Sequence, residues 1–180
     1  MYATVASVAV SNKAHCRSSL NREAQTLGRS ARMINPLKEV EINEFLFRHP
    51  RVPDALEGVR IAQITDVHMG RWVKPRHIQQ IVDHVNDSQT DLVALTGDYV
   101  GYNKDDLVPC LETLANLDPP SYGVLGNHDH WTSTEESIRA FEVAGIPLLS
   151  NVATRMKLRD TEFDVVGVDD HVTRNADVEK

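Results

Sequence analysis

Three apolar segments of strand length, each followed by an amphipathic helical pattern, constrain the fold of this chain more than any other feature. The strand candidates are residues 59–64, 91–96 and 122–125, and the helices that follow them are residues 74–86, 105–117 and 133–144, in the same order. A chain that alternates in this way folds as an α/β protein, because each helix carries it back across the sheet in a right-handed crossover. We therefore predict a mostly parallel sheet covered by helices.

The helical patterns have apolar residues at intervals of three and four, which places these residues on one face of each helix. They are Ile78, Ile81, Val82 and Val85 in the first helix, and Leu107, Leu111, Leu114 and Leu117 in the second. Cys110 falls near the second stripe, so we predict that it fills the core. The third helix has a capping box at its start, with Thr132 or Ser133 as the capping residue, and Gly145 after its end.

Residues outside the three units predict further strands. Residues 38–48 alternate between apolar and polar side chains, which indicates a half-exposed strand at a sheet edge. Residues 152–158 and 163–168 are joined by a short polar connection and predict an antiparallel hairpin.

Polar side chains follow each of the three predicted parallel strands. They are Asp66 and His68 after the first strand, Asp98 after the second, and Asn127 and His128 after the third. Because the carboxyl ends of parallel strands meet at one edge of a sheet, we expect these side chains to converge. Carboxylate, imidazole and carboxamide groups together can bind divalent transition metals.

A glycine stands directly before the polar residue in two of these loops, at Gly97 and at Gly126. A backbone that turns sharply and approaches a cation closely leaves no room for a side chain. The glycines therefore agree with a site at this edge. We expect the neighbouring Asp129 to accept backbone hydrogen bonds and organise its loop. His130 is either a polar loop residue or a contact for the substrate, and His171 is expected to be an exposed loop residue rather than one that reaches the edge of the site.

Three ordered motifs, Asp66-x-His68, Gly97-Asp98-Tyr99-Val100 and Gly126-Asn127-His128-Asp129, resemble those of the calcineurin-like metallophosphoesterases. The resemblance covers about residues 36–171. The sequences around Trp131 and Val168-Asp-Asp170 are most similar to a bacterial subgroup of membrane-associated phosphodiesterases. The resemblance implies an α/β/β/α sandwich fold.

The resemblance also implies a role for each candidate residue. Asp66 and His68 would bind a first metal ion, Asp98 would bridge two ions, and Asn127 would bind the second. His128 would be the catalytic residue, placed beside the phosphoryl group to stabilise developing charge or to protonate the leaving oxygen.

Two cations, typically about 3.5–4 Å apart, would activate a water and stabilise the attacking and leaving oxygens of a phosphoric ester. The mixed ligands favour manganese, iron or zinc. We therefore predict a metal-dependent phosphoesterase, a hydrolase of phosphodiesters or of lipid-linked phosphates.

The resemblance further implies additional histidines in later motifs, and the sequence ends at Lys180 before either of them. We therefore expect an incomplete sandwich whose carboxyl-terminal part is missing, with an exposed sheet face that favours self-association. The alternative is a truncated, non-catalytic metal-binding or scaffold derivative of the fold.

Composition divides the chain and limits its partners. Residues 1–33 are rich in Ser, Ala and Arg and predict a leader or disordered extension, which leaves residues 34–180 as the partial metallophosphoesterase domain. A net charge of −7 argues against nucleic-acid binding by bulk charge. No apolar run is long enough for a transmembrane helix, so we expect a protein that is cytoplasmic or peripheral at a membrane.

Overall fold

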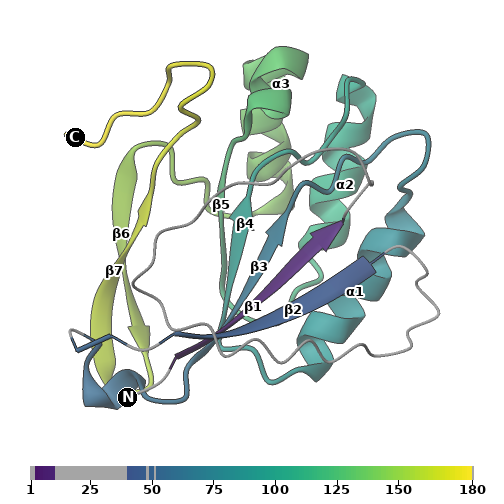
Figure 1. Cartoon of the computed structure of the whole chain (residues 1–180). Coiled ribbons are helices and arrows are strands. Elements are labelled where there is room, and N and C mark those ends of the chain that lie inside the picture. The colour runs from purple at the N-terminus through teal and green to yellow at the C-terminus, as the bar shows by residue number, and fades with distance from the viewer. Residues whose placement is uncertain (1–2, 11–39, 48, 51, 180) are drawn as a thin grey trace.

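The computed structural model describes residues 3–10, 40–47, 49–50 and 52–179. Its main sheet has five strands in the order β2-β1-β3-β4-β5 (Figure 1). The strands are β1 (Ala3–Val10), β2 (Val40–Phe47), β3 (Arg60–Thr65), β4 (Leu92–Thr96) and β5 (Ser121–Val124). Strands β1, β3, β4 and β5 run parallel, and β2 is antiparallel to β1 at the edge. The predicted α/β class, its parallel sheet and the edge strand are confirmed.

Strand β1 lies within the segment for which the sequence predicts a leader. It pairs with β2 on one side and with β3 on the other, so that Val5 is opposite both Phe45 and Ile61. Residues 11–39 lie outside the described residues, and so does the boundary predicted at residue 33. The division of the chain at that boundary stays a prediction.

Three helices follow β3, β4 and β5 and lie together on one side of the sheet (Figure 1). They are α1 (Pro75–Asp87), α2 (Leu107–Leu114) and α3 (Asn127–Ala144), with short 3-10 turns at Asp54–Leu56 and Lys104–Asp106. The predicted apolar face of α1 and that of α2 up to Leu114 are buried in one core with the sheet, and Cys110 is buried among them. Helix α2 ends at Leu114, before the predicted end, so Leu117 lies beyond it and is only partly buried. This burial of apolar surface holds the helices against the sheet.

Helix α3 starts earlier than the sequence predicts. The helical backbone begins at Asn127 and is interrupted at Ser133, which has an extended conformation. The Ser133 hydroxyl accepts a hydrogen bond from the Glu136 amide, so Ser133 caps the second part of the helix as the capping-box pattern indicates. Gly145 ends the helix in the left-handed conformation. The first part of α3 carries the third motif.

The hairpin of β6 (Val152–Leu158) and β7 (Thr161–Gly167) forms a separate antiparallel sheet, as predicted. Arg159 stands in the turn between β6 and β7 and reaches the segments that precede β3 and β4. Its guanidinium donates to the carbonyl of Glu57 and lies 3.6 Å from the carboxylate of Asp91. Figure 1 shows the hairpin beside the main sheet.

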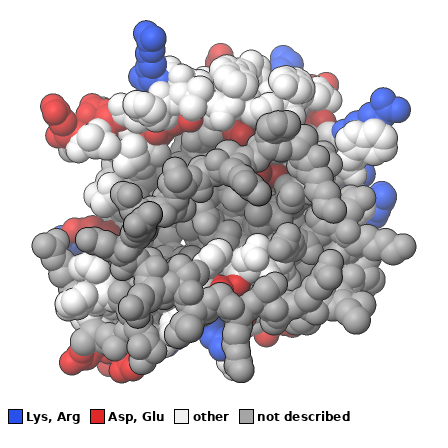
Figure 2. Space-filling view, in the orientation of Figure 1, with Lys and Arg blue, Asp and Glu red and all other residues white. Residues whose placement is uncertain are grey.

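Among the described helices, none has the length and apolar character needed to cross a membrane. On the face shown in Figure 2, the described basic side chains are scattered among acidic ones and do not gather in one patch.

Candidate metal centre

The first two motifs leave their strands through residues with unusual backbone angles. Asp66, His68 and Asp98 all have positive φ, with values of 54°, 46° and 59°. Residues other than glycine adopt this left-handed conformation at a cost of order 1–3 kcal/mol, and such residues cluster at functional sites. Here the Asp66 amide donates to the Gly97 carbonyl, and the His68 amide donates to the Asp98 carbonyl. These hydrogen bonds join the two loops and hold both in their strained form.

The loops bring three metal-ligating groups together. The candidate ligand atoms of His68, Asp98 and His128 all lie within 4.8 Å of one another. The Nε2 atom of His68 is 3.6 Å from Asp98 Oδ2 and 3.7 Å from Asp66 Oδ1. Ligand atoms around one cation are roughly 3 Å apart, so small side-chain rotations would allow these groups to share an ion.

Gly97 and Gly126 are required by the close approach of the second and third motifs. A Cβ atom at Gly97 would lie 2.5 Å from the Gly126 amide nitrogen, and one at Gly126 would lie 2.6 Å from the Asp98 nitrogen. Both separations are below van der Waals contact. Gly97 also has a φ of 88°, which glycine adopts without strain. The structure thus gives the two glycines a different role from the predicted one: they let the backbones of the second and third motifs pack against each other, and the predicted approach to a cation stays a prediction.

Asp129 ties the second motif to the third. Its carboxylate is fully buried and accepts hydrogen bonds from the amides of Asp98, Tyr99 and Gly126 at 2.8–2.9 Å. Burial raises the pKa of Asp129 to about 6, although these three backbone hydrogen bonds favour the ionised form. The prediction that Asp129 organises its loop is confirmed.

His128 contacts both other loops of the centre. Its amide donates to Asp98 Oδ1, and its ring Nδ1 lies 2.9 Å from the Gly101 carbonyl. A carbonyl oxygen only accepts, so this contact places a proton on Nδ1 and leaves Nε2 free to accept or to carry a second proton. The ring also packs edge-on against His68 with 4.6 Å between centroids.

The neighbouring charges at the centre shift two pKa values. The Asp66 carboxylate raises the pKa of His68, burial opposes this shift, and the Asp98 carboxylate adds to it. In return His68 lowers the pKa of Asp66. The centre therefore favours a positive charge at this point, as expected for a cation site.

The structure thus brings together His68, Asp98 and His128, with Asp66 against His68. Asn127 is the first residue of α3, directly before His128 at the same edge of the sheet. Assignment of Asp66, His68, Asp98 and Asn127 as ligands, and of His128 as the catalytic residue, stays a prediction.

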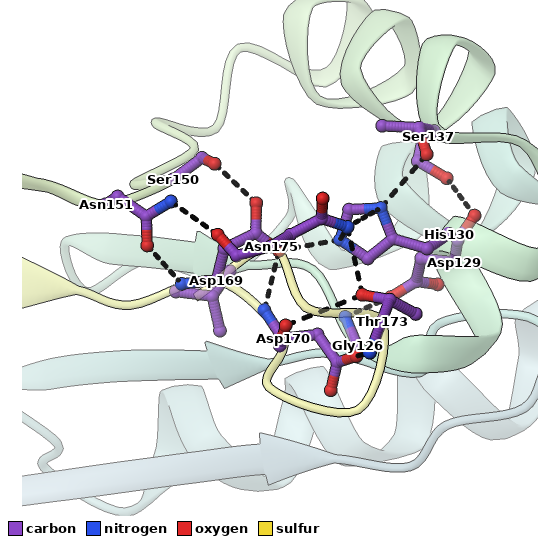
Figure 3. A network of polar contacts seen from close by, with 12 residues as sticks. Gly126, Asp129, His130, Ser137, Ser150, Asn151, Asp169, Asp170, Thr173 and Asn175 are labelled. Carbon is purple, nitrogen blue, oxygen red and sulfur yellow. Dashed lines mark hydrogen bonds and ion pairs between the residues drawn. The ribbon is translucent and has the colours of Figure 1, made fainter. Parts of the chain in front are cut away.

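A network of polar side chains around His130 and Asp169 lies beside the third motif (Figure 3), and the sequence did not predict it. His130 Nε2 lies 2.6 Å from Asp169 Oδ1, and both side chains are only 6% exposed. The Ser150 hydroxyl and the Asp170 amide also donate to the Asp169 carboxylate. Burial would raise the pKa of Asp169, but these hydrogen bonds and His130 lower it overall. His130 is therefore a buried partner of Asp169 and not simply a polar loop residue, whereas His171 is exposed as expected.

A cleft of about 630 Å³ opens beside the centre. His68 and His128 line it, together with residues of the β3–α1 loop and of the loop after β4. The cleft would give a ligand access to the side chains of His68 and His128.

Comparison with known families agrees with this architecture. The model of the family described as "Calcineurin-like phosphoesterase" matches residues 59–174, which include all three motifs and the helices between them. The chain belongs to this family of metal-dependent phosphoesterases.

Several curated proteins are similar to the chain. "Transmembrane protein with metallophosphoesterase domain" of Danio rerio is 29% identical over 126 residues, which are 67% of this chain and 29% of that protein. "Uncharacterized metallophosphoesterase YkuE" of Bacillus subtilis is 25% identical over 159 residues, or 83% and 54% of the two chains. "Phosphodiesterase YaeI" of Escherichia coli is 30% identical over 118 residues, or 62% and 43%. The chain spans at most 54% of the length of these three relatives.

Proposed function

We propose that this protein hydrolyses phosphoric esters at a centre of two divalent cations held by Asp66, His68, Asp98 and Asn127. The observation that carries this proposal is the convergence of His68, Asp98 and His128 from three loops to within 4.8 Å, in a chain of the metallophosphoesterase family. The donor set fits manganese, iron or zinc, because it combines imidazole nitrogen with carboxylate and carboxamide oxygen.

Bound cations would supply Lewis acidity, which lowers the pKa of a water and neutralises the phosphate charge. The side chains of the protein position the reactants. The Asp98 carboxylate is oriented by the His128 amide at Oδ1, so that Oδ2 is presented on the side of His68. The Gly101 carbonyl holds the His128 ring by Nδ1, which leaves Nε2 to stabilise or protonate a phosphate oxygen.

The preferred substrates are proposed to be phosphodiesters, including lipid-linked phosphates, as in the bacterial membrane-associated subgroup. Two relatives support this choice by their names, one as a phosphodiesterase and one as a transmembrane protein with this domain. We also propose that β6 and β7 belong to the second sheet of the α/β/β/α sandwich. Their separation from the main sheet supports this assignment.

Hydrolysis of bis-p-nitrophenyl phosphate by the purified chain, with and without Mn²⁺, tests the function. We expect Mn²⁺-dependent turnover that falls by about 10²–10³-fold in Asp98→Asn, because the carboxylate that would hold the cations is lost, and with it the positive charge that stabilises the transition state. Asp87→Asn is the matched control, since Asp87 is an exposed residue at the end of α1.

Equal turnover of Asp98→Asn and the unaltered protein would contradict the proposal. Absence of turnover in a protein that still binds Mn²⁺ in calorimetry would instead support the non-catalytic metal-binding alternative.

A further inference from the structure

The cleft beside the centre has two walls that the proposed chemistry does not use. One comes from the loop between β3 and α1 and contains Arg71, Trp72 and Lys74, and the other contains Tyr102, Asn103 and Asp106. Its volume of about 630 Å³ is within the range of small-ligand sites, roughly 300–1,000 Å³. The cleft can therefore accommodate a group larger than a phosphate.

Large aromatic side chains line this cleft with most of their surface free. Trp72 is 69% exposed and Tyr102 is 80% exposed. The Tyr102 ring lies 5.1 Å from the His128 ring, centroid to centroid, so an aromatic surface begins beside the proposed catalytic histidine. Exposed faces of this kind offer stacking partners to a planar ring.

Charged groups in the cleft are of both signs. The Arg71 guanidinium lies over the Trp72 ring, 5.0 Å from its centroid, and Lys74 and Asp106 complete the charged lining. An arginine stacked on an aromatic ring keeps the N–H groups at its edge free for an anion. In a chain with a net charge of −7, the side chains of Arg71 and Lys74 outnumber Asp106 in this lining, and this local excess of positive charge favours a ligand that carries negative charge.

We propose that this cleft is a subsite for one ester group of a phosphodiester, and that it selects ester groups that contain a planar aromatic ring. The ring stacks on Trp72 and Tyr102, and Arg71 contacts the charged phosphate to which the ring is joined. The inference rests on the proposed function only for the position of the phosphoryl group at His68 and His128.

An aliphatic group would gain from burial in this cleft, but a ring gains from stacking as well. Removing one stacking partner weakens binding of a planar ring by about tenfold. The preference for a phenyl over a methyl group is therefore the quantity that the subsite controls.

Equilibrium binding of phenylphosphonate and of methylphosphonate to the purified chain with Mn²⁺, measured by calorimetry, tests the subsite without any turnover. We expect the phenyl compound to bind about tenfold more tightly. This ratio should fall toward one in Trp72→Ala and recover in Trp72→Phe, which restores an aromatic face. Phe45→Ala, which removes a partly exposed ring from the edge strand β2, should keep the ratio.

A second measurement compares hydrolysis of phenyl and methyl p-nitrophenyl phosphate, which share one leaving group. We expect the lower KM for the phenyl diester in the unaltered protein and not in Trp72→Ala. Hydrolysis of both diesters with equal KM would overturn the subsite and leave the proposed function standing. A phenyl preference in binding without any hydrolysis would support the subsite and contradict the function.

Three results of the binding measurement would overturn the inference. They are a phenyl-to-methyl ratio near one in the unaltered protein, a ratio unchanged by Trp72→Ala, and no binding of either compound. Attachment to anionic phospholipid vesicles that depends on Trp72, with a ratio of one, would assign the aromatic side chains to a lipid surface instead.

Discussion

The buried carboxylate of Asp169 provides the sharpest test of how the third motif is held. Asp169 accepts hydrogen bonds from the Ser150 hydroxyl and the Asp170 amide, and it pairs with His130. Substitution by alanine removes all three acceptor contacts. Each hydrogen bond to a charged group contributes about 1.5–3 kcal/mol, and contributions within one network do not add fully.

We expect Asp169→Ala to lower the free energy of unfolding by about 3 kcal/mol, which agrees with the loss of one partner of a buried pair. With a urea dependence of about 2 kcal/mol per molar, the unfolding midpoint should fall by about 1.5 M. Asp169→Asn keeps one acceptor oxygen and loses the charge, so its unfolding midpoint should lie between that of the unaltered protein and that of Asp169→Ala.

Far-ultraviolet circular dichroism is a suitable signal for this urea titration, because the helices α1, α2 and α3 contribute a large signal that is lost on unfolding. Asp160→Ala is the matched control, since Asp160 is exposed in the turn between β6 and β7. If Asp169→Ala unfolds at the same urea concentration as Asp160→Ala, the network does not stabilise the fold and the reasoning is refuted.

Three further predictions concern the charge of Asp169 and the proposed metal centre. The pKa of Asp169 is lowered in the folded state from its usual value of 3.8. The stabilisation by the ionised carboxylate should therefore be complete above pH 3.8 and be lost as the pH falls through the lowered pKa. Acid unfolding of Asp169→Asn beside the unaltered protein measures this loss. Gly126→Ala should weaken Mn²⁺ binding more than tenfold in calorimetry, because its Cβ would displace Asp98, and unchanged affinity would contradict the close approach. Mn²⁺ at a hundred times its Kd should stabilise the unaltered protein by about 2.7 kcal/mol in thermal unfolding, and Asp98→Asn should show less.

Local sequence patterns predicted the elements of the fold from β2 onward because each is encoded over a few residues, whereas β1 was not predicted as a strand. The apolar intervals of α1 and α2 correspond to the buried faces in the structure. The start of α3 at Asn127 was missed for a physical reason. Gly126-Asn127-His128 has the composition of a loop, so its sequence does not indicate a helix. The Asp129 carboxylate accepts a hydrogen bond from the Gly126 amide at the start of the helix, and the same carboxylate also accepts from the amides of Asp98 and Tyr99 in the second motif.

The sequence allowed us to predict that the ends of the parallel strands converge, but not the geometry of the side chains that they carry. Strand ends indicated that Asp66, His68 and Asp98 would meet, because parallel strands place their carboxyl ends at one edge. The pairing of His130 with Asp169 was not predictable, because the two residues are 39 positions apart and no local pattern connects them. The Trp72 and Tyr102 surfaces were missed for the same reason, since each lies on a separate loop.

The hydrogen bonds of the centre run in series from the third motif to the first. Asp129 fixes the amides of Asp98 and Tyr99, and the carbonyls of the same two residues accept from the amides of His68 and Met69. The left-handed conformations of His68 and Asp98 therefore depend on a carboxylate that is not among the proposed ligands. A change at Asp129 should thus disturb the first motif as well as its own, although the two are far apart in the sequence. This serial arrangement explains how the loops of the first two motifs hold costly backbone angles beside the start of α3 at the edge of the sheet.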